Sequence, residues 1–193
     1  AVYCAIEQYE KALDPLLKSA KISTESNSRE SLLSVQDSIA ETYLNLKDYK
    51  KALEFYTKCY VLSKEIQSKQ EEAFALNGLG NTHIALKEHD KAEHYFNKCL
   101  EIRKETGFKF GEAVTLNNLG NLFFVKNDLD KAVSYLKQAY DISLLVGSKE
   151  GIYQSSENLA ELYEKLGETN EALRYSKIYP QAKKDMRNPV SYT

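Results

Sequence analysis

Apolar side chains recur along the chain at steps of three and four residues, which is the periodicity of an amphipathic α-helix. Between Lys69 and Leu86 this spacing places six residues on one stripe: Ala73, Leu76, Leu79, Gly80, His83 and Leu86. A second stripe, between His89 and Thr106, consists of Ala92, Phe96, Cys99 and Ile102. Only Lys87 and Glu88 separate the two stripes. The pattern therefore predicts two antiparallel helices joined by a tight turn.

This hairpin pattern returns every 40 residues along the chain. The segment Leu76-Asn77-Gly78-Leu79-Gly80-Asn81 is echoed by Leu116-Asn117-Asn118-Leu119-Gly120-Asn121. The same 40-residue spacing separates the pairs Lys11-Ala12, Lys51-Ala52, Lys91-Ala92, Lys131-Ala132 and Glu171-Ala172. A fixed period of this kind indicates a repeat array, in which each unit buries its apolar face against its neighbours. Gly107 and Gly147 end the second helix in two units and suit a left-handed C-terminal cap.

Small residues occupy fixed positions in the register. Each complete unit has one directly after a large apolar residue, in Ile39-Ala40, Leu79-Gly80, Leu119-Gly120 and Leu159-Ala160. A ring follows three residues later, at Tyr43, His83, Phe123 and Tyr163. Alanine or glycine lets two helices cross closely, and a large side chain from the facing helix then fills the space. We therefore expect Gly80 and Gly120 to lie inside helices despite a propensity cost of about 1 kcal/mol each.

The order Leu-Gly, Tyr, Ala, Phe resembles the tetratricopeptide repeat (TPR), from about Leu32 to Tyr179. The period of 40 residues is longer than the usual period of about 34. It resembles the lengthened repeats of Pins-type spindle-orientation adaptors and of several bacterial signalling proteins. The opening Trp of the family is replaced here by Gln36, Leu76, Leu116 and Ser156, and the closing Pro is absent.

The resemblance implies an all-α fold, a right-handed α-α superhelix of about four full repeats with a partial repeat before them. We expect a single TPR array over residues 1–187, divided into 1–31, 32–71, 72–111, 112–151 and 152–187. Residues 188–193 have no pattern, and we expect a flexible tail there.

The two ends of the array are less regular. Asp14-Pro15 falls inside a predicted second helix, so that helix is either kinked or restarted with Asp14 as its N-cap. Near the other end, Ser176 and Tyr179 replace a large apolar and a small residue. The last helix is then either a polar cap or the start of a connection. The chain begins at Ala1 within a repeat, which suggests a piece of a longer protein.

Composition and charge exclude several classes of partner. The net charge is −2 and 28% of the residues are charged, so bulk electrostatics favour neither nucleic acid nor an anionic membrane. No apolar run approaches the roughly 18 residues of a membrane span, and no signal peptide is visible. We expect a soluble, cytoplasmic protein.

The sequence offers no arrangement of catalytic or metal-binding residues and no phosphate-binding loop, so we expect neither an enzyme nor a cofactor. His83 lies on the core stripe and takes the place of an aromatic ring. His89 and His94 are five residues apart, which does not suit a metal pair on one helix face. The three cysteines, Cys4, Cys59 and Cys99, lack disulfide or C-x-x-C spacing, and we expect small buried side chains.

Recurring asparagines are the candidate binding residues. Asn77 and Asn81 lie about 140° from the centre of the core stripe, and Asn117 and Asn121 repeat them. An amide offers both a donor and an acceptor, which match the backbone of an extended peptide. The alternative is that asparagine is simply a tolerated polar residue on an exposed face. In TPR proteins the first helices line a concave groove, so the resemblance places these amides there.

Acidic residues flank the asparagines in the register: Asp37 and Glu41 in the unit before, and Glu157 and Glu161 in the unit after. A peptide with basic residues near its ends would complement such a groove. We therefore expect a protein- or peptide-binding scaffold or adaptor. The alternative, from the lengthened repeats, is a regulatory sensor region of a larger bacterial signalling enzyme, of the histidine kinase or diguanylate cyclase type. Homo-oligomerisation through the end repeats is compatible with either.

Overall fold

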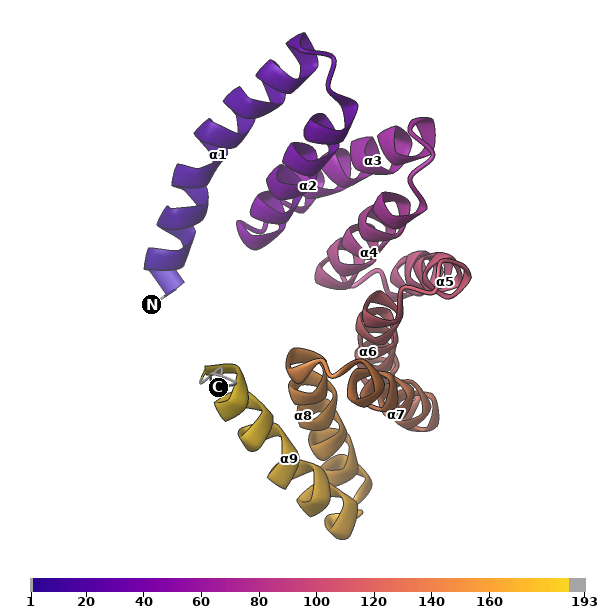
Figure 1. Ribbon diagram of the computed structural model, residues 1–193. Helices are drawn as coiled ribbons and strands as arrows, with labels where there is room; N and C mark the ends of the chain where they lie inside the picture. Colours follow the sequence, from indigo (N-terminus) through magenta and orange to yellow (C-terminus); the bar gives the residue numbers. More distant parts are fainter. Residues whose placement is uncertain (1, 188–193) are drawn as a thin grey trace, which may run out of the picture. The chain divides into compact units, whose positions relative to one another are not determined.

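The computed structural model describes residues 2–187, and every regular element in that range is an α-helix (Figure 1). The helices are α1 (Val2–Glu25), α2 (Arg29–Asn45), α3 (Tyr49–Glu65), α4 (Lys69–Ala85), α5 (His89–Glu105), α6 (Lys109–Val125), α7 (Leu129–Val146), α8 (Lys149–Leu166) and α9 (Thr169–Arg187). The predicted helices Lys69 to Leu86 and His89 to Thr106 agree with α4 and α5 to within one residue. The all-α repeat fold is thus confirmed.

The helices form two compact units, one ending at Ile102 and the other beginning at Arg103. In the first unit, α2 contacts both α3 and α4. In the second unit, α6 likewise contacts both α7 and α8, so each unit repeats the same neighbour relations.

Each tight turn between consecutive helices contains a residue in the left-handed region of backbone conformation. Gly107, Gly147 and Gly167 have φ between 69° and 75°, and the glycine caps expected at the first two are confirmed. Five other turns use a non-glycine residue with φ between 56° and 62°: Asn27, Lys47, Gln67, Lys87 and Asn127. The residue after each turn often caps the next helix, as Asp48 does by accepting from the Lys51 N–H at 3.2 Å.

The small residues lie where large side chains of a facing helix press closely. A Cβ on Gly80 would lie 2.5 Å from the Phe96 ring, and one on Gly120 would lie 2.5 Å from Leu136 Cγ. Gly78 meets the ring of Tyr56 in the same way. The expected close crossings are therefore present at both Gly80 and Gly120.

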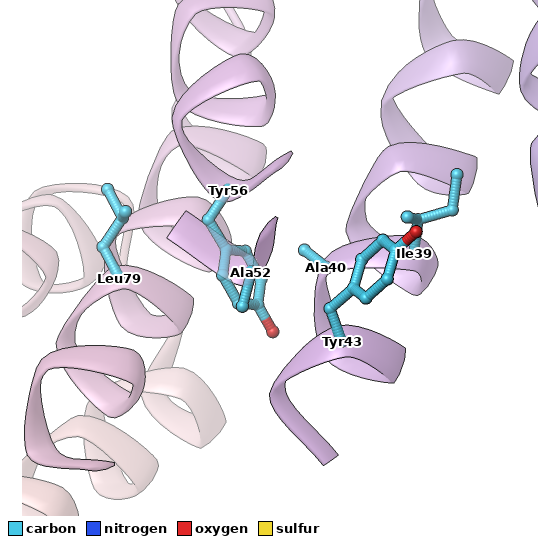
Figure 2. Packing of buried hydrophobic residues seen from close by; sticks show 6 residues of the cluster. All are labelled: Ile39, Ala40, Tyr43, Ala52, Tyr56 and Leu79. Atoms are coloured by element: carbon cyan, nitrogen blue, oxygen red, sulfur yellow. The ribbon is translucent and has the colours of Figure 1, made fainter. Parts of the chain in front are cut away.

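Figure 2 shows the core cluster that α2, α3 and α4 share. The cluster consists of buried Ile39, Ala40, Tyr43, Ala52, Tyr56 and Leu79. The residue three positions after the small residue packs on a ring of the second helix in every complete repeat. These stacked pairs, with centroids 5.2 to 5.8 Å apart, are Tyr43 with Phe55, His83 with Tyr95, Phe123 with Tyr135, and Tyr163 with Tyr175. His83 is thus a core residue, as expected.

Replacing Ala132 with leucine is expected to lower the free energy of unfolding by about 1 to 3 kcal/mol. Ala132 has no exposed surface, so added carbon atoms must displace packed neighbours. Thermal melts of the variant and the parent measure the effect, and an unchanged melt would place Ala132 outside a close helix crossing.

The first helix decides one of the alternatives left open at Pro15. α1 runs without interruption through Pro15, so the helix does not restart at Asp14. Leu13 and Leu16, on either side of the proline, pack against the core cluster, and this packing offsets the cost of the lost hydrogen bond. α9 likewise continues through Pro180. The predicted tail at 188–193 lies outside the described residues.

Cys59 and Cys99 are buried, as expected, with exposed fractions of 1% and 0%. Burial first, and then the negative charges of Asp37 and Glu71, raise the pKa of the Cys59 thiol to about 12. Such a thiol stays protonated at neutral pH and is a poor nucleophile. The side chain of Cys4 lies outside the described part of the chain.

Candidate functional site

In the first unit, the candidate residues lie on the two neighbouring first helices, α2 and α4. Asp37 and Glu41 are one turn apart on α2, and Asn77 and Asn81 are one turn apart on α4. Glu41 is exposed, whereas Asp37, Asn77 and Asn81 are half-buried. Because α2 contacts α4, this unit presents carboxylates and amides on adjacent helices.

Asp37 is the most strongly perturbed carboxyl group of this surface. Burial first, and then the negative charges of Glu41 and Glu71, raise its pKa from 3.8 to about 6. The structure gives Asp37 no hydrogen bond or ion pair with any of the residues that it describes. A carboxylate left partly desolvated beside like charges favours a cation from another molecule.

A cavity of about 260 Å³ lies between α2, α3 and the start of α4 in the first unit. Its lining consists of Glu30, Leu33, Ser34, Ile66, Ser68 and Glu71. The lining therefore combines two carboxylates and two serines with two apolar side chains. Glu71 was not among the candidate residues expected from the sequence, although its position in the first turn of α4 was predictable from the helix boundaries.

In the second unit, Asn117 differs from the expectation that it faces away from the packed layer. It is only 8% exposed, and its Oδ1 accepts a hydrogen bond from Asn158 Nδ2 of α8 at 3.0 Å. Asn117 also lines a cavity of about 10 Å³, which leaves space for a single water molecule at most. The angle measured around one helix does not include the neighbouring first helix, and α8 covers that side of α6.

The other candidates of the second unit reach solvent. Asn121 is half-buried on α6, and Glu157 and Glu161 are exposed on α8. Glu157 Oε1 accepts a hydrogen bond from the Tyr153 hydroxyl at 2.8 Å. Asn158, which was not among the expected candidates, occupies the position equivalent to Asn118 one repeat later.

Among the residues that the structure describes, no group of three or more His, Cys, Asp or Glu side chains could hold a metal ion. His83 Nδ1 instead lies 2.6 Å from Glu88 Oε2, and this contact lowers the pKa of Glu88. No helix in the described range has the length and apolar character that crossing a membrane would need.

The repeated helical hairpins, in which a small residue on one helix faces a large side chain on the other, are typical of a known repeat family. Family models described as tetratricopeptide repeat match residues 71–145 and 112–177, and another with the same description matches residues 34–65. The chain belongs to the tetratricopeptide repeat family. No curated protein sequence matches it.

Several solved structures share the fold of this TPR chain. BtubC (BKLC) from P. vanneervenii aligns with a TM-score of 0.79 and 21% identity, covering 94% of this chain and 75% of that one. Aspartyl phosphate phosphatase F from Bacillus subtilis aligns with a TM-score of 0.72 and 16% identity, covering 94% and 57%. A Rap protein complexed with competence and sporulation factor aligns with a TM-score of 0.68 and 16% identity, covering 94% and 60%. At these identities the likeness concerns the fold.

Proposed function

We propose that this TPR array is a protein-binding module that holds an extended peptide segment with basic residues on the surface of its first helices. Asp37 carries the proposal, because a half-buried carboxylate with carboxylate neighbours and no ion pair among the described residues is costly to the folded chain. A lysine or arginine side chain of a partner would remove that cost. The site works by binding, and no catalytic step is part of the proposal.

In this proposal, the amides of each unit help to set the register of a segment bound to that unit. Asn77, Asn81 and Asn121 are half-buried side chains that can meet backbone N–H and C=O groups. The Oδ1 of Asn117 already accepts a hydrogen bond from Asn158, so Asn117 can contact a peptide only through its amide hydrogens. In the second unit, considered by itself, Glu157 and Glu161 are exposed and suit a basic residue of a bound segment.

The test is selection of a displayed random dodecamer library on the parent chain, followed by affinity measurements on the selected peptides. We expect enrichment of lysine and arginine, and a loss of about 2- to 10-fold in affinity for Asn77→Ala or Asn81→Ala, since one hydrogen bond contributes about 0.5 to 1.5 kcal/mol. Asn97→Ala, at an exposed position of α5, is the matched control and should not change the affinity.

The acidity of Asp37 adds a pH dependence to the same measurement. Its pKa of about 6 means that the carboxylate takes up a proton as the pH falls from 7.5 to 5. A basic peptide should therefore bind more weakly at pH 5, and Asp37→Asn should remove part of that dependence. Selected peptides without basic residues, or binding that ignores Asp37, Asn77 and Asn81 alike, would contradict the proposed function.

A second candidate is the regulatory region of a larger signalling enzyme, of the histidine kinase or diguanylate cyclase type. The likeness to a Rap protein complexed with competence and sporulation factor supports it, because there the same fold binds a factor. Hydrogen exchange separates the candidates. A regulatory array should change its protection in helices beyond the bound surface, whereas a simple adaptor should change only α2, α4, α6 and α8. Light scattering tests self-association.

A further inference from the structure

The cavity between α2, the end of α3 and the start of α4 has a counterpart in the second unit. Five of its six lining positions recur two periods of 40 residues later, and there they line the small cavity between α6, α7 and α8. The residues at these positions are Glu30, Leu33, Ser34, Ser68 and Glu71 in the first unit, and Phe110, Ala113, Val114, Ser148 and Gly151 in the second. The same place in the repeat measures about 260 Å³ in the first unit and about 10 Å³ in the second.

Two side chains explain the difference on the first-helix side of the cavity. Phe110 and Val114 of α6 hold the places that Glu30 and Ser34 hold on α2. An aromatic ring and a branched apolar side chain therefore fill the space in the second unit. In the first unit an exposed carboxylate and an exposed hydroxyl border it instead. The short serine side chain leaves room for a group from another molecule.

A glycine explains the difference on the side of the following helix. Gly151 of α8 packs so closely on Ser143 of α7 that a Cβ at this position would collide with the serine Oγ. Glu71 has a Cβ at the equivalent position of α4, so α4 cannot approach Ser63, the equivalent of Ser143, in this way. The open cavity is thus a property of the first-unit sequence and is not shared by every repeat.

The two carboxylates of the cavity have no counter-ion of their own. Through their side chains, Glu30 and Glu71 form no ion pair or hydrogen bond with any residue whose side chain the structure describes. Arg29 and Lys69, the nearest basic residues along the chain, each pair with a different glutamate, at 3.3 and 3.2 Å. Glu71 is also half-buried, which raises the cost of its charge. A cation from another molecule would therefore meet two uncompensated carboxylates.

The lining favours a guanidinium group over an ammonium group. Leu33 and Ile66 offer apolar contact to a methylene stem, and Ser34 and Ser68 add hydroxyl oxygens to the carboxylate oxygens. Acceptors thus come from α2 and from the start of α4. A guanidinium carries five N–H donors in a planar fork and can serve several acceptors at once, whereas an ammonium is compact and strongly hydrated.

We propose that this cavity receives an arginine side chain of the bound segment, with the guanidinium held by Glu30 and Glu71 and the stem packed on Leu33 and Ile66. The proposal rests on the proposed function, for which it names the basic residue and its place. Glu71 also connects the cavity to Asp37, because its negative charge contributes to the raised pKa of Asp37. A guanidinium beside Glu71 would offset part of that charge, so the cavity and Asp37 belong to one binding site.

The test compares acetyl-Gly-Gly-Arg-Gly-Gly-amide with the same peptide carrying citrulline, which has the shape of arginine without its charge. In NMR titrations of the parent chain, we expect the arginine peptide to bind about 10- to 100-fold more tightly than the citrulline peptide. We expect it to bind about 2- to 5-fold more tightly than a lysine peptide. Glu30→Gln and Glu71→Gln should each lower its affinity about 3- to 10-fold. Glu150→Gln, at the position of Glu30 on α8, is the matched control and should change nothing.

A second variant tests the cavity by filling it. The next repeat has Phe74 at the position of Ser34, and this ring is 37% exposed, so we expect α2 to tolerate Ser34→Phe. The variant should keep the urea midpoint of the parent and lose at least about 10-fold in affinity for the arginine peptide. Gln154→Phe, which places the same ring at the equivalent position of α8, should leave the affinity unchanged.

Equal affinity for the arginine and citrulline peptides, tighter binding of the lysine peptide, or arginine binding that survives both Glu71→Gln and Ser34→Phe would overturn the proposal. Failure of the proposed function gives a different result, since library peptides would then lack basic residues or ignore Asp37. Basic library peptides that depend on Asp37 but not on Glu30 or Glu71 would leave the proposed function in place and reject the arginine cavity.

Discussion

Replacing Phe96 with alanine is expected to lower the free energy of unfolding by about 3 to 5 kcal/mol, the largest effect we expect of a single substitution. The ring is fully buried on α5 and fills the space that Gly80 leaves on α4. Alanine would remove the ring and leave a cavity between two helices whose close crossing depends on it. In a repeat array the loss weakens the interfaces on which neighbouring repeats depend.

Urea titration followed by circular dichroism measures this loss as a lower denaturation midpoint. Phe110→Ala is the matched control, because it removes the same ring from a side chain that is 47% exposed. We expect a change of only about 0.5 kcal/mol there, as for other exposed positions. Similar midpoints for the two variants would show that Phe96 does not support the helix crossing.

Replacing Asp37 with asparagine is expected to stabilise the fold at neutral pH and to weaken binding of a basic peptide. In the folded chain the pKa of Asp37 is about 6, whereas the ordinary value is 3.8. Below pH 3.8 the carboxyl group is protonated in both folded and unfolded chains and carries no penalty. As the pH rises from 3.8 to 6, the unfolded chain ionises freely, whereas the folded chain must keep its proton or hold a desolvated charge. Stability therefore falls, and the full penalty is reached above pH 6. Asparagine stays neutral throughout.

The expected gain at pH 7.5 is about 1 to 3 kcal/mol, since each pKa unit corresponds to about 1.4 kcal/mol and the group is partly solvated. Urea titrations at several pH values should show no gain below pH 4 and the full gain above pH 7. Glu41→Gln should give a smaller gain, because it removes one of the negative charges that raise the pKa of Asp37. A gain independent of pH would contradict this account.

Opposite effects on stability and binding would distinguish a functional carboxylate from a structural one. A substitution that stabilises the fold and weakens binding is the result expected where a costly charge serves a binding site. If Asp37→Asn stabilises the chain and leaves peptide affinity unchanged, the acidic surface of the first unit has no role in binding.

Most of the fold could be predicted because its causes are local. The three- and four-residue spacing that defines α4 and α5 depends only on neighbours along the chain, and the glycine caps at Gly107 and Gly147 depend on backbone conformation at one residue. The 40-residue register then pairs each small residue with a facing large one, as Gly80 with Phe96. Pro15 was ambiguous for the opposite reason, since packing of its neighbours against other helices keeps α1 continuous.

The candidate site was predictable only as a set of positions. Sequence placed Asp37, Glu41, Asn77 and Asn81 on the first helices, but it could not show which amide a neighbouring helix covers. Asn117 is buried because α8 brings Asn158 to it, across a distance in sequence that no helical periodicity describes.

The sequence by itself determined that this protein is an array of helical hairpins, because helix formation, capping and the repeat register depend on residues close together in the chain or on a fixed period. Only the tertiary structure decided the chemistry of its surfaces. The pKa of Asp37 depends on Glu71 of another helix, and the burial of Asn117 depends on Asn158 of another helix. Burial and electrostatic interaction act through space, so these properties arise only when the helices are packed.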